Sequence, residues 1–374
     1  MKKIFTINCG STSTKVAYFE DDKMVNKVSL DVTAEQLKQM PKTLQQLELR
    51  ANQVKTFLKD NQLDPKDFDI IVARAGTIPA VPYDGAFEVN ELMLASVTYA
   101  PEAQHASTLS CLIANELVKG LDVPVIIYDP TCVDSADPIA KITGIPEITN
   151  MPIAHLLNTK MAGITYAESI GKKYKDLNLI IVQLGGGITL GFHDHGRIAD
   201  WVYDDEGPMS PQRAGRIPTR YLANLCYNSK MTLQEMRMYL CGQAGLVAYF
   251  GTQDVRDIEK LIDEGDEKAE LVLHAMAYGV AKSIGELSVI RKGKVDQIVL
   301  TGGIAYSKRI TGWIKELVEF IAPVSVIPGE KEMEALAAGG LRVLKGEEEI
   351  HPYNVYPKGY HSIEEIINNP NFLA

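Results

Sequence analysis

The sequence predicts an α/β protein built from two related domains. Its 374 residues exceed the size at which a single hydrophobic core usually stops growing. Segments with strand patterns alternate with segments of helical spacing. A strand, a glycine-rich turn and a second strand occur near residue 1 and again near residue 180. This repeat indicates two halves of similar structure.

The first half begins with two predicted strands, residues 3–7 and 16–19, joined by a turn over residues 10–14. Helical spacing covers residues 37–58, and a β-branched strand over 68–73 ends at Arg74. A helix over 109–118 precedes a strand over 123–128. That strand ends at Asp129 because Pro130 cannot continue a central ladder. Arg74 and Asp129 are therefore expected at the ends of two strands.

The second half repeats this order. We expect a helix over 156–174, strands over 179–184 and 188–192, a long helix over 271–288 and a buried strand over 297–300. Patterns of helix, strand and helix follow over 314–320, 324–327 and 333–344. After Lys345 the chain is polar and rich in proline, so we expect this tail to pack on the surface or to fray.

Composition excludes several classes of protein. Apolar residues make up 46% and charged residues 23% of the chain, which is typical of a globular protein. The net charge of −10 disfavours a nucleic-acid partner, because binding to phosphates requires a basic surface. Five scattered cysteines without CxxC spacing suggest neither disulfides nor zinc and favour the cytoplasm. No apolar run reaches the roughly 18 residues of a membrane span, so neither a membrane partner nor secretion is expected.

Three glycine-containing turns follow predicted strands. The first, NCGSTSTK, joins backbone amides, hydroxyl groups and an ammonium group, and taken alone it also fits an ordinary hairpin turn. The others are the LGGGIT and LTGGIA segments. Glycine at such points allows the backbone to approach a ligand closely. Together the three turns favour phosphate or nucleotide binding. Their candidate residues are Asn8, Ser11, Ser13, Lys15, Gly185, Gly186, Gly187, Gly302, Gly303 and Ile304.

Longer strings identify a family. TINCGSTSTK, HLLNTKMA, LGGGITLG, EGPMSPQRAG, LTGGIAYSKRI and IAPVSVIPGEKEMEALAAGGLRVL resemble butyrate kinases, in order, between about residues 3 and 348. The resemblance implies two ribonuclease-H-like domains of the actin-like ATPase class flanking an ATP cleft, in a homodimer. It assigns residues 1–150 and 335–374 to the first domain and residues 151–334 to a second, nucleotide-binding domain.

The resemblance also implies roles for individual residues. Arg74, Asp129, His155 and Arg213 match the family's catalytic residues. Asp129 and Glu332 match its magnesium ligands, with Glu330 and Glu334 close by in the sequence. Asp254 and Arg256 match the segment near adenosine. Each of these residues has an ordinary structural explanation when it is considered alone, such as a surface arginine or an aspartate that opens a turn.

The implied activity is the reversible transfer of a phosphoryl group between ATP and a short-chain fatty acid, giving ADP and an acyl phosphate, with Mg²⁺ as cofactor. A fatty-acid carboxylate has a pKa near that of Glu, about 4.3, so it is already an anionic nucleophile at neutral pH. It needs no general base, unlike the hydroxyl group of a sugar. Cations must instead offset the repulsion between the two substrates.

Four residues depart from the family pattern: Cys9, Ala75, Gln183 and Arg216. Ala75 lies in the segment expected near the acyl chain, so propionate, butyrate and branched C4 to C5 acids all remain candidate substrates. Cys9 is expected to be a packing residue rather than a nucleophile. Two alternatives stay open: an acetate or propionate kinase, and a nucleotide-binding regulator without catalysis.

Overall fold

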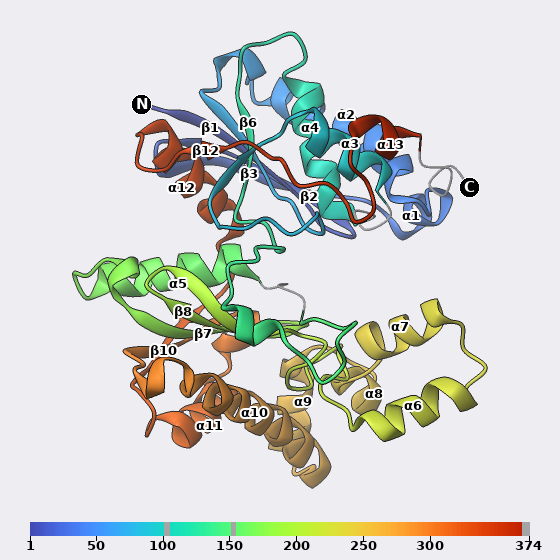
Figure 1. Cartoon of the computed structure of the whole chain (residues 1–374), viewed down its shortest axis with the longest axis vertical. Helices are drawn as coiled ribbons and strands as arrows, with labels where there is room; N and C mark the ends of the chain where they lie inside the picture. Colours follow the sequence, from blue (N-terminus) through green and yellow to red (C-terminus); the bar gives the residue numbers. More distant parts are fainter. Residues whose placement is uncertain (101–104, 151–154, 369–374) are drawn as a thin grey trace. The chain divides into compact units, whose positions relative to one another are not determined.

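The structure is a computed structural model that describes residues 1–100, 105–150 and 155–368 (Figure 1). It divides into two compact units, one of residues 1–134 and 331–368 and one of residues 135–330. Residues 135–150, which the sequence assigned to the first domain, group with the second unit. Asp137 gives a physical reason, because its backbone N–H donates to Ala199 and its carboxylate pairs with Arg197 and Arg291.

The first unit contains a seven-stranded sheet in the order β12, β5, β6, β4, β1, β2, β3. Its strands are β1 (Lys3–Cys9), β2 (Ser13–Glu20), β3 (Lys23–Asp31), β4 (Ile70–Ala73), β5 (Ala86–Glu88), β6 (Val125–Tyr128) and β12 (Ile350–His351). β1, β4 and β6 run parallel. Every residue of β4 and β6 is buried, as expected for parallel strands that are covered on both faces.

The helices of the first unit are α1 (Ala34–Gln39), α2 (Leu47–Asp60), α3 (Glu91–Tyr99), α4 (Leu109–Leu117), α12 (Glu332–Leu344) and α13 (Ile363–Ile367). α12 approaches the sheet closely through two glycines. A β-carbon on Gly340 would lie 2.7 Å from Val72, and one on Gly339 would lie 2.5 Å from the ring of Tyr128. The missing side chains therefore set the depth at which α12 packs.

The tail after Lys345 is attached to the first unit. β12 pairs in parallel with β5, and the Asn90 side chain donates to the carbonyl of Tyr353 at 2.8 Å. Tyr353 and Ile366 are buried. Up to residue 368 the tail therefore adds a strand and a short helix to the unit and does not fray.

The second unit contains a five-stranded sheet in the order β11, β10, β7, β8, β9. Its strands are β7 (Asn178–Leu184), β8 (Ile188–Asp194), β9 (Arg197–Val202), β10 (Gln297–Gly302) and β11 (Val324–Pro328). Its helices are α5 (Leu156–Ser169), α6 (Thr219–Asn228), α7 (Leu233–Gly242), α8 (Leu246–Phe250), α9 (Val255–Asp263), α10 (Glu267–Ser288) and α11 (Lys308–Val318). In the described parts of the chain, no helix combines the length and apolar character needed to cross a membrane.

The two sheets share one topology. The order β6, β4, β1, β2, β3 in the first unit corresponds to β11, β10, β7, β8, β9 in the second. In each, three parallel strands continue into an antiparallel meander. Each meander has a register shift in its second hairpin, at Tyr18/Phe19 and at Phe192/His193. The repeat that the sequence indicated is therefore present, and it extends from a hairpin to five strands.

A buried arginine shapes the turn between β1 and β2. Arg50 on α2 is fully buried and donates to the carbonyls of Ser11 and Ser13 at 3.0 and 2.9 Å. It also donates to the hydroxyl of Thr14 at 3.0 Å. The backbone N–H of Gly10 closes the turn on the carbonyl of Ser13 at 2.7 Å. The conformation of this turn thus depends on a helix more than 30 residues away in the chain.

Candidate functional site

In the first unit, Arg74 lies where β4 ends and is connected to three other predicted site residues. Its backbone N–H donates to Ile7 of β1, and its Nη1 donates to the carbonyl of Asp129 at 2.9 Å. Its Nε lies 3.9 Å from Oε1 of Glu332, and Oε2 of Glu332 accepts from Nδ2 of Asn8 at 2.7 Å. Asn8, Arg74, Asp129 and Glu332 therefore form one cluster at the ends of β1, β4 and β6 and the start of α12.

Asp129 has an unusual backbone conformation. Its backbone φ is +42°, a value that residues other than Gly, Asn and Asp seldom adopt. The backbone of Gly85 exchanges hydrogen bonds with it: Gly85 N–H donates to Oδ1 at 2.8 Å, and Asp129 N–H donates to the Gly85 carbonyl at 3.0 Å. Strained backbone held by such contacts is typical of binding and catalytic sites.

The remaining predicted residues of the first turn are more exposed. Ser11 and Lys15 are exposed and Ser13 is half-buried. Lys15 lies on β2 directly opposite Asn8, so both side chains belong to the same region of the sheet. Cys9 is buried, which raises the pKa of its thiol, as expected for a packing residue.

His105 belongs near this cluster although its role was not predicted from the sequence. Its Nδ1 lies 2.7 Å from the Ser107 hydroxyl and accepts from the Ser107 backbone N–H at 3.2 Å. Partial desolvation and the charge of Arg74 lower the pKa of His105. The imidazole is therefore held in its neutral form at neutral pH. His105 lies 31 residues from Arg74 in the chain, and only the fold brings the two close enough for the charge of Arg74 to act on the imidazole.

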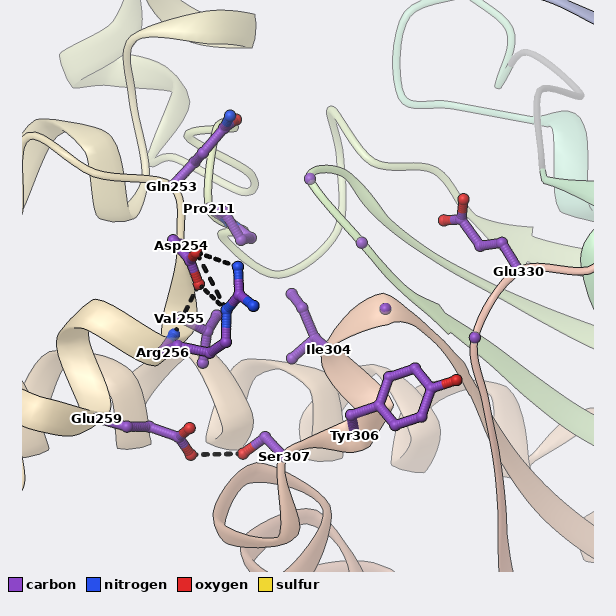
Figure 2. Close-up of a pocket in the computed structure, with 14 residues that line it drawn as sticks. Pro211, Gln253, Asp254, Val255, Arg256, Glu259, Ile304, Tyr306, Ser307 and Glu330 are labelled. Carbon is purple, nitrogen blue, oxygen red and sulfur yellow. Dashed lines mark hydrogen bonds and ion pairs between the residues drawn. The ribbon is translucent and has the colours of Figure 1, made fainter. Parts of the chain in front are cut away.

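In the second unit, a pocket of about 840 Å³ gathers residues from five separate segments (Figure 2). Six of the predicted residues line it: Gly185, Gly186, Asp254, Arg256, Gly303 and Ile304. Glu330, which the sequence left as an alternative to Glu332 for the glutamate near magnesium, also lines it. The sequence did not single out the remaining lining residues as ligands: Pro211, Gln253, Val255, Glu259, Tyr306, Ser307 and Gly329. The pocket has the size of a small-molecule site and lies at the carboxyl ends of parallel strands, where α/β sheets bind ligands.

An ion pair stands on one wall of this pocket. Asp254 is the N-cap of α9, and its carboxylate accepts from Nε and Nη2 of Arg256 at 2.9 and 2.6 Å (Figure 2). The hydrogen bond from Arg256 lowers the pKa of Asp254 to about 2. Across the pocket, Ser307 donates to Glu259 at 2.7 Å. These polar groups surround the apolar side chain of Ile304, an arrangement suited to a flat ring with a polar substituent.

The glycine turns form the other wall. Gly302 ends β10 with a φ of +93°, and a β-carbon there would lie 2.8 Å from the backbone N and C atoms of Leu184. The neighbouring Gly303 has open space where a β-carbon would be. Gly302 therefore lets the end of β10 lie directly against the backbone at the end of β7.

A chain of amides and a carboxylate supports the second glycine turn. Nδ2 of Asn158 donates to Oε1 of Gln183 at 2.6 Å, and Nε2 of Gln183 donates to Oε1 of Glu330 at 2.9 Å. Gln183 is buried at the end of β7. Its neutral amide is therefore oriented from both sides.

His155 and Arg213 also belong to the second unit. His155 precedes α5, and its Nδ1 lies 3.0 Å from the hydroxyl of Thr189 on β8. Arg213 lies in the segment after β9 and contacts the second glycine turn through Ser210, whose hydroxyl donates to the carbonyl of Gly186 at 2.6 Å. Arg216, by contrast, forms an exposed ion pair with Glu286 at 2.8 Å.

The structure thus assembles two groups of predicted residues. One is the arginine and carboxylate cluster of the first unit, and the other is the pocket of the second unit with its adjoining His155 and Arg213. Among the described residues, no three His, Cys, Asp or Glu side chains come together to hold a metal ion. The pocket can accept a nucleotide, and the cluster offers a guanidinium group and two carboxylates.

Comparison with known proteins agrees with this arrangement. The acetokinase family model matches residues 157–318. Butyrate kinase 2 of Clostridium acetobutylicum is 40% identical over 353 residues, which is 94% of this chain and 99% of that protein. A probable butyrate kinase of Bacteroides thetaiotaomicron is 43% identical over 354 residues, again 94% of this chain and 99% of that protein. The crystal structure of Porphyromonas gingivalis acetate kinase superposes with a TM-score of 0.76 at 17% identity, covering 92% of this chain and 100% of that one. This likeness establishes the actin-like ATPase fold.

We predict that Gly302→Ala is destabilising and Gly303→Ala is not. At Gly302 both the positive φ and the backbone of Leu184 oppose a β-carbon, and we expect a loss of about 2 kcal/mol in the free energy of unfolding. Gly303 offers open space, so its alanine variant is the matched control. Urea unfolding of both variants measures the difference. Equal stability would show that the ends of β7 and β10 do not meet as described.

We also predict that Arg74→Gln raises the pKa of His105. Partial desolvation keeps that pKa low in both proteins, but only the wild type has the Arg74 cation that further disfavours the imidazolium form. A pH titration of the histidine signals by NMR measures the shift, and His105→Gln identifies the signal. An unchanged His105 titration would show that Arg74 does not act on this ring.

Proposed function

Since the chain belongs to the acetokinase family and its curated relatives are butyrate kinases, we propose that it transfers a phosphoryl group reversibly between ATP and butyrate. The products of the forward reaction are butyryl phosphate and ADP. The observation that carries this proposal is the pocket of the second unit, where glycine turns that end two parallel strands adjoin the Asp254 and Arg256 pair. Such turns offer backbone N–H groups to phosphate oxygens.

We assign ATP to this pocket. In this assignment the turns after β7 and β10 receive the phosphates, and Ile304, Asp254 and Arg256 adjoin the nucleoside. Fixed backbone amides are effective because they need no reorganisation when charge develops on the transferred group. Gly185 and Gly303 supply the close approach that side chains would block.

The main barrier to the reaction is electrostatic repulsion between a carboxylate and a triphosphate, and the guanidinium groups of Arg74 and Arg213 would offset it. In this proposal Arg74 binds the fatty-acid carboxylate and Arg213 binds oxygens of the transferred phosphoryl group, because the planar fork of arginine matches both anions. His155 donates a hydrogen bond to the same phosphoryl group. The fatty-acid carboxylate is already ionised at neutral pH and attacks phosphorus directly, so no residue needs to remove a proton.

Mg²⁺ fits the donors of the first unit. This ion is usually held by one or two carboxylates together with water and substrate phosphates, rather than by a cage of protein ligands. Asp129 and Glu332 are two such carboxylates, and they are linked through Arg74. When bound, Mg²⁺ would neutralise part of the phosphate charge. Asn8 and Arg74 orient Glu332, and Gly85 orients Asp129.

The acyl chain requires apolar surface close to Arg74. Ala75, Ile78 and Val81 follow it in the chain and are buried. One methylene group in an apolar pocket changes binding by about 1 to 3 kcal/mol. Butyrate is longer than acetate by two methylene groups, so we expect butyrate to be preferred over acetate by a factor of roughly 30 or more, with branched C4 to C5 acids also accepted.

The proposal extends to a homodimer in the cytoplasm. All five cysteines are free, which suits a reducing compartment. α6 buries none of its residues, and large apolar side chains are exposed on and beside α6 and α7, including Tyr221, Tyr227, Leu233 and Met238. A surface of this kind marks an interface. A second copy of the chain is the partner that we propose.

The activity is tested by measuring acyl phosphate as the hydroxamate, with ATP, Mg²⁺ and a panel of straight and branched C2 to C5 acids. We expect product with butyrate, and Arg74→Ala should lower turnover by a factor of roughly 10² to 10³. The exposed Lys55→Ala serves as control, because Lys55 forms only a surface pair with Glu116. Nucleotide binding without acyl phosphate from any acid would favour a non-catalytic regulator, and a preference for acetate or propionate would change the substrate.

The dimer is tested by light scattering after size-exclusion chromatography. The wild type should have about twice the mass of the 41.2 kDa chain. Tyr227→Asp introduces a charge into the exposed apolar surface and should shift the mass toward that of one chain. A control at Lys23→Asp, on the other unit, should leave the mass unchanged. A monomeric wild type would contradict the proposal.

A further inference from the structure

Asp204 is a buried carboxylate that neither the sequence patterns nor the proposed mechanism includes. It lies two residues after β9, and its side chain is 5% exposed. Nε of Arg213 donates to its Oδ2 at 3.1 Å. Although burial opposes the charge of Arg213, the neighbouring Asp204 and Asp205 raise its pKa. Arg213 is therefore a fixed cation with a defined partner.

Arg213 is held at three points. Besides the bond to Asp204, its Nη1 donates to the carbonyl of Cys241, and its backbone N–H donates to the hydroxyl of Ser210 at 3.2 Å. The Ser210 hydroxyl in turn donates to Gly186 at 2.6 Å. Within the described chain, Nη2 of Arg213 makes no hydrogen bond to protein. One edge of the guanidinium group is thus anchored, and Nη2 stays available for a ligand oxygen.

The second glycine turn is shaped to receive Asp204. A β-carbon on Gly187 would overlap Oδ2 of Asp204 and would lie 3.1 Å from its Cβ and Cγ atoms. The absence of a side chain at Gly187 therefore lets the Asp204 carboxylate lie directly against the turn. Asp204 contacts both elements that the proposed mechanism uses, the glycine turn and Arg213.

The contacts of Asp204 are a poor arrangement for stability alone. Its Oδ1 is buried and has no hydrogen-bond partner in the described chain. A buried, partly satisfied carboxylate costs desolvation energy that its ion pair need not recover. The presence of a carboxylate at this buried position is therefore better explained by its orientation of Arg213 than by a contribution of Asp204 to folding.

We propose that Asp204 is a positioning residue that orients the Arg213 guanidinium group beside the Gly185 to Gly187 turn, so that Nη2 faces the phosphoryl group. This inference rests on the proposed function, because it assigns Asp204 a part in the same reaction. Asp204 touches no reacting atom and acts through Arg213.

A double-mutant cycle tests this proposal. Asp204→Asn keeps the shape but removes the charge, and we expect kcat for acyl phosphate formation to fall about 10- to 100-fold with little change in the KM for ATP. Once Arg213→Ala has removed the group that Asp204 orients, adding Asp204→Asn should change kcat less than about threefold. Asp176→Asn is the control: Asp176 is an exposed aspartate of the same unit, at the end of the short helical turn Tyr174–Asp176, so its variant should retain wild-type kcat.

Three outcomes overturn the proposal. In the first, Asp204→Asn retains wild-type kcat. In the second, Asp204→Asn lowers kcat by the same factor in the Arg213→Ala background as in the wild type, which would show that Asp204 acts independently of Arg213. If the wild type forms no acyl phosphate, the proposed function fails and this inference with it, whereas an active wild type with an additive cycle removes the inference alone. Thermal unfolding checks that each variant is folded, and Asp204→Ser, which creates space and not a clash with Gly187, provides a second variant.

Discussion

Electrostatic repulsion between two anions is the constraint on which this account depends. A carboxylate and a triphosphate meet only where fixed positive groups and oriented N–H donors offset their charges. The chain has a net charge of −10, so this compensation must be local. In the proposed mechanism it comes from Arg74 of the first unit, which is fixed by backbone contacts on β1 and beside β6. The glycine turns and Arg213 of the second unit would supply the rest, and Asp204 anchors Arg213.

The duplicated topology explains why these groups are available twice. Each unit ends three parallel strands at one edge of its sheet, and the proposed site residues lie at or just after these ends: Asn8, Arg74 and Asp129 in the first unit, and the glycine turns in the second. The two units differ in the groups that they present at these strand ends. The first presents buried charged side chains, whereas the second presents backbone and an open pocket.

Local patterns were sufficient to predict most of the strands, the glycine turns and the residues at strand ends, because turn chemistry and apolar runs are encoded within a few positions. β3, β5, β9 and β12 were missed. β3 alternates between exposed and half-buried residues, β5 and β12 have only three and two residues, and Arg197 and Asp200 interrupt the apolar pattern of β9. Arg50, His105 and Asp204 could not be found this way. Each acts on residues that only folding brings near it, and in the sequence each is one polar residue among many. The sequence assigned the tail to the first domain but did not predict the strand and short helix that it forms there.

The central claim, that the fatty-acid carboxylate itself attacks the phosphoryl group of ATP, is tested most directly with butyrate labelled with ¹⁸O in both carboxyl oxygens. The acyl phosphate product is observed by ³¹P NMR, in which an ¹⁸O atom bound to phosphorus shifts the resonance. The account predicts that the product carries one carboxylate ¹⁸O in the bridge to phosphorus. A product resonance without the isotope shift, or no acyl phosphate resonance at all, would contradict it.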